Sequence, residues 1–466
     1  MAKYKAYPEY KDSGVEWLKS TPAHWSSAPI KYLALATNSL FLDGDWIESK
    51  DISDDGVRYI TTGNVGEGLY KEQGSGFITE NTFSKLNCTE VFEGDILISR
   101  LNNPIGRACL VPSLGYKTVT SVDNVIFRTD KYYNRKYLVY LFSSKDYFQH
   151  TGNLARGTTM QRISRGLLGN IRIPVPTRSE QASIAAFLDH ETAKIDNLIE
   201  KQLQLIELLK EKRQAVISYA VTKGLNPDVP MKDSGVEWLG EVPEHWKICR
   251  IKQLSKQISK GTTPSTIGGD FVDEGIRFLK AENIGKSKFV NSLPEFYISN
   301  DVDKQISRSR LQERDVLVII AGATTGMASV LQKEILPANT NQAVSFIRTK
   351  NSNHADWVYY WLGTDTIQRI IGMGAVQAAQ PNLSMEDLGN IPILLPEQDE
   401  LASICMEIEK QFVQFESLIC KAESAIDLMQ ERRTALISAA VTGKIDVRDW
   451  VAPDSQDVEE PEEATA

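Results

Sequence analysis

Two stretches of the chain carry apolar residues at alternating steps of three and four positions. The clearer row comprises Leu401, Cys405, Ile408, Phe412, Phe415, Ile419, Ala422, Ile426, Met429 and Leu436. A rougher row, with Gln202 inside it, comprises Ile184, Leu188, Ile195, Leu198, Leu205, Leu209 and Val216. A heptad pattern of this length favours a coiled-coil seam. We therefore predict two helices, over residues 180–224 and 397–445, each roughly 60 Å long.

The neighbouring residues indicate how these helices begin, end and pair. Glu180 and Glu397 follow proline-punctuated segments, where an acidic side chain favours a helix N-terminus. Gly224 and Gly443 are suited to stopping a helix. A lone helix of this length would expose its apolar row, so we expect the two to pack together. The short link over residues 225–231 favours an antiparallel pair, because a parallel pair would need the second half to fold back along the helices.

The segment before each predicted helix reads as a mixed α/β unit. Short β-like runs lie at 57–61, 95–99 and 119–127, and again at 276–280, 315–320 and 343–347. An aromatic-rich helix candidate follows at 135–148 and at 355–371. A proline-containing segment then closes each unit, at 173–176 and 391–396.

The two halves are copies of one unit at an offset of about 220 residues. KDSGVEWLKSTPAHW, residues 11–25, returns as KDSGVEWLGEVPEHW, residues 232–246, with 11 of 15 positions identical. The match continues in register, for example between residues 168–171 and 388–391. The predicted class is α+β with a pseudo-twofold internal repeat. We expect an N-terminal α/β domain over 1–179, a long helix over 180–224, a C-terminal α/β domain over 225–396, a second helix over 397–445, and an acidic disordered tail over 446–466.

The Pro-x-His-Trp string occurs once in each copy, ending at Trp25 and at Trp246. A repeated histidine could indicate a functional pair. The interpretation we favour is structural: a packing corner that opens each α/β unit.

Composition and cysteine usage bound the environment. The chain has 42% apolar and 24% charged residues, which is ordinary for a soluble protein. No apolar run is long enough to span a membrane, and the first residues lack the apolar core of a signal peptide. The five cysteines lie far apart, which indicates reduced thiols in a cytoplasm. We therefore expect a cytoplasmic protein without a membrane partner.

The net charge of −9 argues against a nucleic-acid partner, but its distribution weakens that argument. Six of the acidic residues lie between Asp454 and Glu463, in the expected tail. Residues 147–179 carry five arginines and no acidic residue. Residues 96–122 carry three basic residues and, again, no acidic residue. Particular surfaces can therefore be basic.

The sequence lacks several catalytic motifs: those of an adenine methyltransferase, an ATPase, a metal site and a nuclease. The nearest string to an adenine methyltransferase motif, residues 102–105, lacks the second proline and the aromatic residue. The chain has no Walker A loop, and its histidines lack metal-ligand spacing. Glu313 and Asp315 could belong to a nuclease motif, but no lysine follows them at a suitable spacing. We expect no catalytic residue, no metal and no cofactor in this chain.

Taken together, these features resemble the DNA-specificity subunits of type I restriction-modification systems over roughly residues 8–445. The resemblance rests on the doubled KDSGVEWL and Pro-x-His-Trp block, on Glu180-Gln181 and Glu397-Gln398 at the helix starts, and on the related strings at 213–218 and 433–438. It implies two target-recognition domains that read a bipartite gapped sequence in double-stranded DNA, with the helices as spacer. It also implies two modification subunits that use S-adenosylmethionine to methylate adenine at N6, and restriction subunits that use ATP and Mg; these cofactors are expected on the partners.

DNA recognition needs donors and acceptors that reach base edges, and cations that hold phosphates. The candidates in the N-terminal copy are Arg100, Asn102, Asn103, Arg107, Arg156, Thr158, Thr159, Gln161 and Arg162. Those in the C-terminal copy are Lys260, Thr262, Thr263, Thr324, Thr325, Asn339, Gln342, Gln377 and Gln380. For each residue the alternative is an ordinary solvated loop position. For the whole chain the alternative is a non-catalytic coiled-coil adaptor whose α/β ends bind proteins.

Overall fold

The computed structural model describes residues 4–73, 76–101, 103–157, 160–375 and 382–451. These fall into two compact units. The first unit comprises residues 1–202 and 424–466, and the second comprises residues 203–423. This division crosses the five segments expected from the sequence, because each long helix contributes to both units. Of the tail expected over 446–466, residues 446–451 are described and pack on the first unit, and residues 452–466 lie outside the described residues.

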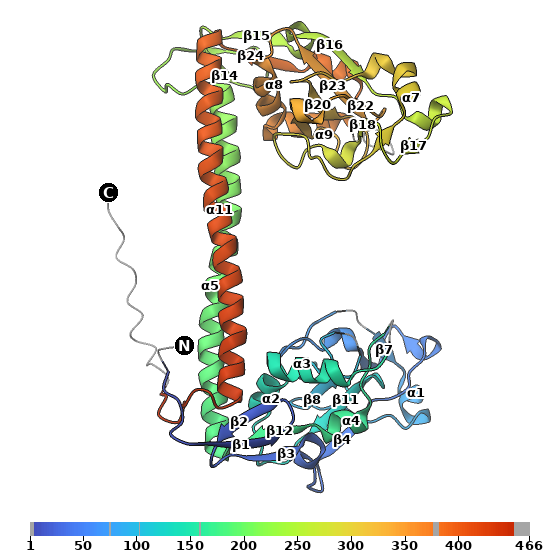
Figure 1. Ribbon diagram of the computed structural model, residues 1–466, viewed down its shortest axis with the longest axis vertical. Helices are drawn as coiled ribbons and strands as arrows, with labels where there is room; N and C mark the ends of the chain where they lie inside the picture. The colour runs from blue at the N-terminus through green and yellow to red at the C-terminus, as the bar shows by residue number, and fades with distance from the viewer. Residues whose placement is uncertain (1–3, 74–75, 102, 158–159, 376–381, 452–466) are drawn as a thin grey trace. The chain divides into compact units, whose positions relative to one another are not determined.

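The described strands of the first unit form two four-stranded sheets, and Figure 1 labels some of their strands, among them β4, β8 and β11. One sheet is antiparallel, in the order β4 (Leu40–Asp43), β11 (Asn124–Arg128), β8 (Ile96–Ser99) and β9 (Ala108–Leu110). The other has the order β10 (Thr118–Thr120), β6 (Val57–Ile60), β7 (Gly76–Ile78) and β5 (Ile52–Ser53), with β10 and β6 parallel. Two ribbons complete the unit: β1 (Tyr10–Val15) with β2 (Leu18–Pro22), and β12 (Arg172–Val175) with β3 (Ser26–Pro29).

The second unit repeats this plan. Its antiparallel sheet has the order β16 (Ser255–Lys260), β23 (Val344–Thr349), β20 (Val316–Ile319) and β21 (Ala328–Val330). The mixed sheet has the order β17 (Phe271–Val272), β19 (Tyr297–Ile298), β18 (Ile276–Leu279) and β22 (Ala338–Thr340). The ribbons are β13 (Met231–Asp233) with β14 (Glu241–Pro243), and β15 (Lys247–Arg250) with β24 (Pro392–Leu395).

Short helices surround these sheets. The first unit has α1 (Glu80–Lys85), α2 (Arg135–Leu141), α3 (Lys145–Leu154) and α4 (Arg165–Asn170). The second has α6 (Ile251–Leu254), α7 (Asn300–Gln305), α8 (His354–Leu362), α9 (Asp365–Ala375) and α10 (Met385–Asn390). The helix expected over 135–148 is thus two helices, as is the one expected over 355–371. Buried Ser144 and Thr364 lie at these breaks. Their hydroxyls donate to the backbone carbonyls three residues earlier, those of Leu141 and Trp361.

The β-run expected over 119–127 is also divided, into β10 and β11 in different sheets. A turn at residues 121–123 separates them, and the Ser121 carbonyl accepts the Asn124 N–H at 2.9 Å. An apolar run cannot show by itself which sheet each of its residues joins.

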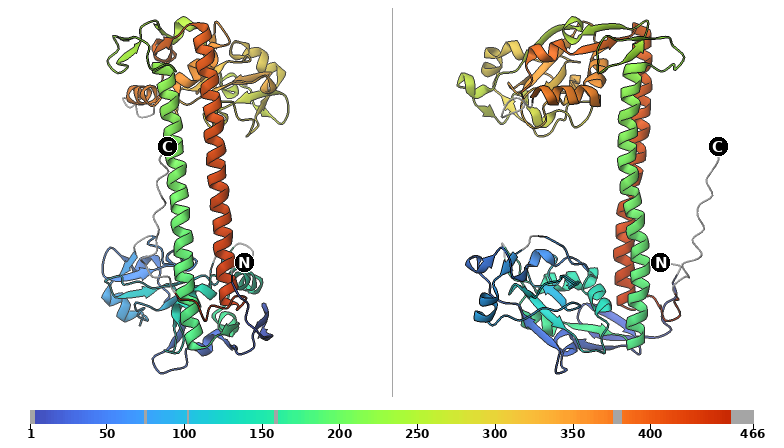
Figure 2. Two further views of the ribbon diagram at one scale, coloured as in Figure 1. Left: turned by 90° about the vertical axis from the view of Figure 1, so that its left-hand side faces the viewer. Right: turned by 180° about the vertical axis from the view of Figure 1, so that it is seen from behind.

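The long helices are α5 (Arg178–Lys223) and α11 (Gln398–Val441), which lie side by side in Figures 1 and 2. In the first unit Arg433 of α11 binds Asp196 of α5 at 2.8 Å. In the second unit Glu416 of α11 binds Arg213 of α5. From the first pair to the second, α5 advances by as many residues as α11 goes back. The predicted antiparallel pairing is therefore confirmed.

The seam follows the predicted row well on α11 and differs on α5. On α11, Leu401, Ile408, Phe415, Ile419 and Ala422 are buried. On α5, Leu198 and Leu205 were expected in the seam, but they are 50% and 41% exposed, whereas Ile206 is 5% exposed. The row at heptad spacing that contains Ile195 and Ile206 also contains two polar residues, Thr192 and Gln202. The exposed residues Leu198 and Leu205 therefore made the predicted apolar row look continuous, although that row is not the buried one.

Each long helix is tied to a Pro-x-His-Trp corner by a glutamate in its first turn. In the first unit Glu180 accepts hydrogen bonds from His24 Nε2 at 2.8 Å and from Trp25 Nε1 at 3.2 Å. In the second unit Glu400 accepts from His245 at 2.8 Å and from Trp246 at 3.1 Å. The packing-corner interpretation is confirmed. The structural counterpart of Glu180 is Glu400, three residues beyond the Glu397 that the sequence match had paired with it.

In each unit, the C-terminal end of the other long helix packs on the same corner. Gly443, just after α11, packs on Trp25, and Gly224, just after α5, packs on Trp246. Both glycines have a positive φ, +74° and +78°. Each unit thus holds the start of one long helix and the end of the other around one buried tryptophan.

A segment beyond α11 closes the first unit. Ile445 and Val447 are buried, and the Trp450 ring packs edge-on against Phe187 at 5.5 Å. The Asp446 N–H donates to the carbonyl of Lys5 at 2.8 Å. Among the described residues, no helix is long and apolar enough to cross a membrane.

Candidate nucleic-acid interface

One end of the antiparallel sheet in the first unit gathers most of the predicted residues of that copy. The chain leaves β8 at Arg100, whose N–H donates to the carbonyl of Asp123 at 2.8 Å. The carbonyl of Arg100 accepts the Ile163 N–H at 3.0 Å. These bonds bring together the loop after β8, the turn before β11 and the segment before α4. Three segments that are distant in sequence thus form one surface.

Arg100 lies beneath this surface. Its side chain is 6% exposed, and Nε lies 3.0 Å from Asp43 Oδ1. Its terminal nitrogens donate to the carbonyls of Ile163 and Val122 at 3.2 Å and 2.6 Å. Burial lowers the pKa of Arg100, and the Asp43 carboxylate opposes that effect. These contacts and this burial do not fit a base contact, so we assign Arg100 to the scaffold of the site.

Arg107 holds the loop that follows β8. It is partly buried and donates to the carbonyls of Val65 at 2.7 Å and Thr62 at 2.9 Å. A third bond, to Leu101 at 2.9 Å, fixes the start of the same loop. Burial lowers the pKa of Arg107. The guanidinium shapes the loop that carries exposed Asn103.

The exposed candidates of the first unit are Asn103, Arg156, Gln161 and Arg162. Arg162 forms an ion pair with Asp123 at 2.7 Å and leaves 44% of its side chain exposed. The backbones of Arg156 and Arg162 bond to each other in both directions at 2.9 Å. Asn102, Thr158 and Thr159 lie outside the described residues. Exposed arginine and amide groups here offer donors to phosphates and to base edges.

The same framework recurs in the second unit. The Ile320 N–H donates to Ala343 and the Leu383 N–H donates to Ile320, both at 2.8 Å. Lys260, Thr324 and Gln342 are exposed, while Thr262, Thr263 and Thr325 are partly buried. The Thr325 hydroxyl donates to the carbonyl of Gly322 at 2.7 Å. Gln377 and Gln380 lie outside the described residues.

Asn339 is a correction to the candidate set. It lies in β22, is fully buried, and donates to Asp303 Oδ1 at 2.9 Å. Its side-chain oxygen accepts from Ser309 at 2.6 Å. With both ends of the amide used inside the fold, Asn339 has a structural role.

A glycine at the sheet end in each unit was missed by the sequence reasoning. A Cβ on Gly44 would lie 2.4 Å from the Thr120 carbonyl oxygen, and one on Gly261 would lie 1.9 Å from that of Thr340. Each glycine directly follows the last residue of an edge strand, Asp43 or Lys260. Close backbone approach therefore fixes where these two charged residues stand.

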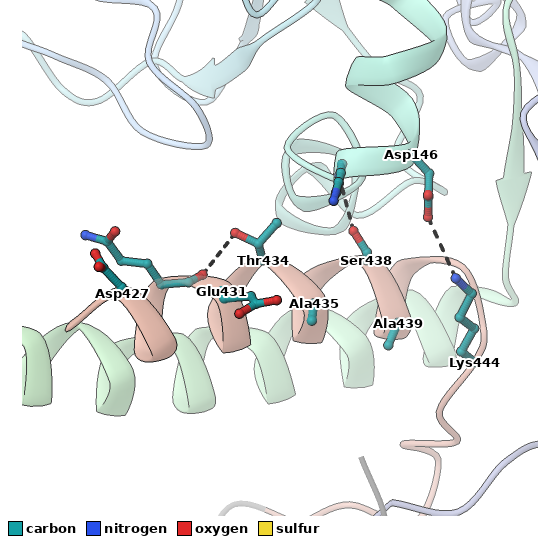
Figure 3. Close-up of a pocket in the computed structure, with 10 residues that line it drawn as sticks. Asp146, Asp427, Glu431, Thr434, Ala435, Ser438, Ala439 and Lys444 are labelled. Carbon is teal, nitrogen blue, oxygen red and sulfur yellow. Dashed lines mark hydrogen bonds and ion pairs between the residues drawn. The ribbon is translucent and has the colours of Figure 1, made fainter. Parts of the chain in front are cut away.

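A hollow of about 590 Å³ lies in the first unit between α3 and α11 (Figure 3). The Lys145 N–H at the start of α3 donates to Ser438 Oγ at 3.2 Å. Lys444 lies 3.8 Å from Asp146. These contacts dock α3 on α11. Within the described ranges, no cluster of three His, Cys, Asp or Glu side chains could hold a metal ion.

Residues 40–208 and 243–418 match the model of the type I restriction modification DNA specificity domain. These matches span more than half of the chain, which belongs to this family of type I restriction-modification specificity subunits. Specificity subunits are the non-catalytic recognition components of their complexes, so the prediction that the chain is not an enzyme is confirmed.

Individual relatives agree with this assignment. The type I restriction enzyme EcoBI specificity subunit of Escherichia coli is 24% identical over 347 residues, 72% of this chain and 70% of that protein. The MjaVIII specificity subunit of Methanocaldococcus jannaschii is 24% identical over 396 residues, 82% of this chain and 87% of that protein.

Two solved structures share the fold. A chain from work on complex assembly and conformational transition of the type I R-M system has a TM-score of 0.69 at 16% identity, covering 91% of this chain and 99% of its own. The HsdS subunit from Thermoanaerobacter tengcongensis has a TM-score of 0.54 at 17% identity, covering 91% of this chain and 98% of its own. The predicted α+β class with a doubled unit and two long helices is confirmed.

Proposed function

We propose that this chain binds double-stranded DNA at a bipartite gapped sequence and that each unit reads one half of it. The observation that carries the proposal is the surface at one end of each antiparallel sheet, around Arg100 and around Ile320, which we call the sheet-end surface. One backbone framework occurs there twice, with different exposed side chains in each copy. The shared framework suits two equivalent docking modes on DNA. The differing side chains suit two different half-sites.

In the same proposal, the chain assembles with two modification subunits and with restriction subunits in the cytoplasm. S-adenosylmethionine, ATP and Mg then belong to these partners, and adenine N6 methylation is their reaction. The family of the chain supports this division of labour, as does the similarity to a chain studied in type I complex assembly. The net charge of −9 suggests that the partners supply part of the DNA affinity.

The first experiment is single-molecule mapping of N6-methyladenine in the genome of the source strain, with and without this gene. A gapped two-part motif that disappears on deletion supports the proposal and gives the target sequence. An unchanged methylome in a strain whose modification subunit is expressed contradicts it. Co-purification of the tagged chain with a methyltransferase subunit checks the assembly.

We further propose that α5 and α11 set the length of the unread gap. One extra heptad adds about 10 Å to a helix, which corresponds to about three base pairs at 3.4 Å each. Inserting a heptad into both helices at matching levels of the pair should therefore lengthen the recognised gap. A methylated motif whose gap does not change excludes this spacer role. An insertion in α5 alone is the control, because it shifts the seam without extending both helices.

The second candidate function is a protein-binding adaptor, favoured by the long helix pair. It predicts that the purified complex binds DNA with no preference for sequence. Competition of a specific duplex against scrambled duplexes distinguishes the two functions.

A further inference from the structure

The backbone framework allows the two sheet-end surfaces to be compared position by position, each within its own unit. Leu101 forms an isolated antiparallel β-bridge with Arg162, and Ala321 forms one with Asn382. Ile163 and Leu383, the next residues, donate their N–H groups to Arg100 and Ile320. Arg162 and Asn382 therefore occupy the same place. Both side chains are exposed.

The residues around this shared place differ in a consistent way. Arg100 and Ile320 donate to the carbonyls of Asp123 and Ala343, which makes Ala343 the counterpart of Asp123. Asp43 pairs with Val125 in the sheet, and Lys260 pairs with Ser345 at the same register. At these two positions the first unit has carboxylates, Asp43 and Asp123, where the second unit has Lys260 and Ala343.

Of these two carboxylates, Asp123 is the one that holds Arg162, while Asp43 pairs with Arg100. Asp123 lies 2.7 Å from one terminal nitrogen of Arg162, and its own backbone is fixed by Arg100. A guanidinium has five N–H donors, so one ion pair leaves donors for a second partner. Fixing the side chain before binding also reduces the entropy lost on contact with a partner.

Asn382 is exposed directly before buried Leu383, with Ser384 capping α10 just beyond. The Ala321 bridge and the Leu383–Ile320 bond fix its backbone. A side-chain amide has both a donor and an acceptor, and it needs no counter-ion. The replacement of Asp123 by Ala343 agrees with this change from a charged to a neutral group.

The chemistry of these two side chains differs in the base that each one suits. Arginine pairs with the O6 and N7 acceptors of guanine, and asparagine pairs with the N6 donor and N7 acceptor of adenine. We propose that Arg162 and Asn382 are equivalent base-reading residues, and that they select a guanine in one half-site and an adenine in the other. Asp123 is a positioning residue for Arg162. This inference rests on the proposed function and names the bases that its site reads.

The test uses the source strain with its own partner subunits. N6-methyladenine is mapped for the wild type, Arg162→Ala and Asn382→Ala. In Arg162→Ala, one position that is guanine in the wild-type motif should become degenerate, with the other half-site unchanged. In Asn382→Ala, one adenine position of the other half-site should become degenerate. Discrimination at the affected position should fall roughly 5- to 150-fold, the range for a bidentate base contact.

Matched controls and a positioning variant sharpen this test. Arg178→Ala and Asn353→Ala remove exposed side chains outside the sheet-end surface and should leave the motif unchanged. Asp123→Ala should relax the same guanine position as Arg162→Ala, to a smaller degree. If Asp123→Ala has no effect at that position, the positioning role is wrong.

Each outcome separates this inference from the proposed function. A wild type without a gapped motif contradicts the proposed function. A wild-type motif with no relaxed position in either variant, or with relaxation at another base, contradicts the inference alone. If a variant abolishes methylation, the purified complex is tested on duplexes with single base-pair exchanges. Uniformly weaker binding to all of them indicates a phosphate contact and overturns the inference, whereas loss of preference at one guanine or adenine supports it.

Discussion

The carboxylate of Glu180 lies 2.8 Å from Nε2 of His24, and this contact ties the first turn of α5 to the corner that precedes β3. The same carboxylate also accepts from Trp25 and from Thr177. Glu400 repeats the contact with His245 in the second unit, but its side chain is 32% exposed against 5% for Glu180. The two glutamates therefore make the same bonds at different depths.

We expect Glu180→Gln to destabilise the first unit by about 1–3 kcal/mol, because an amide cannot accept from all of these donors and leaves buried groups unpaired. Glu400→Gln should cost less, since water can reach its partners. Urea unfolding followed by tryptophan fluorescence measures both. Equal losses would show that the depth of the contact does not matter.

The Glu180 contact should also make stability depend on pH. Burial raises the pKa of Glu180, but the hydrogen bonds from Thr177, His24 and Trp25 outweigh it and lower the pKa below the ordinary 4.5. A carboxyl with a lowered pKa stabilises the fold above its unfolded pKa, and this stability is lost as the pH falls through the folded pKa. Unfolding of the wild type and of Glu180→Gln should therefore differ above about pH 4.5 and converge in more acidic solution. A difference independent of pH would contradict this.

The glycines after the two long helices should respond unequally to alanine. Both have left-handed backbones, which cost a non-glycine residue about 1–2 kcal/mol. A Cβ on Gly443 would lie 2.4 Å from Pro22 Cδ, whereas one on Gly224 would lie 3.3 Å from Trp246. Gly443→Ala should therefore lower the melting temperature more than Gly224→Ala. The opposite order would contradict the packing at Pro22.

A buried ion pair recurs in both antiparallel sheets. Asp95 binds Arg128 at 2.9 Å and 2.6 Å, and Asp315 binds Arg348 at 2.9 Å and 2.7 Å. Both carboxylates are almost fully buried. Arg128→Ala and Arg348→Ala should each cost about 3–5 kcal/mol, because a buried carboxylate loses its partner. The surface pair Arg433–Asp196 is the control, and Arg433→Ala should cost at most about 1 kcal/mol. Denaturant titration compares the three variants.

The seam of α5 can be tested at two adjacent positions. Ile206 is buried and Leu205 is exposed. Ile206→Ala should cost about 2–5 kcal/mol, while Leu205→Ala should stay within about 0.5 kcal/mol. Thermal unfolding followed by circular dichroism measures both. A larger loss for Leu205→Ala would restore the apolar row that the sequence suggested.

Much of the fold could be predicted from the sequence, because repetition and heptads are local patterns. The doubled Trp25 and Trp246 corners and the buried row of α11 follow directly from them. The row of α5 was predicted less well, since the buried positions include polar Thr192, which does not mark a seam, and Ile206 in place of Leu205. The pairing of Glu180 with Glu397 failed because Glu-Gln occurs at both sites three positions out of register.

The candidate site was predicted in outline and not residue by residue. Arginine and asparagine indicate hydrogen-bonding capacity, but burial depends on partners that are distant in sequence. Arg100 meets Asp43, and Asn339 meets Asp303 and Ser309, so both lie inside the fold. The role that we propose for Asn382 was missed because it depends on the β-bridge to Ala321, which no sequence motif marks.

The sharing of each long helix between two units has a consequence for the order of folding. Tyr10 donates to the carbonyl of Gly443, and Tyr137 donates to that of Val441, so the first unit is held by contacts across almost the whole chain. A ribosome delivers every residue of the second unit before the first unit receives its α11 segment. Domains usually complete folding from the N-terminus during synthesis. Here we expect the second unit to be able to complete its fold first, because Ile184 and Leu188 share a core with Leu436 and Ile437 of α11, which are made later.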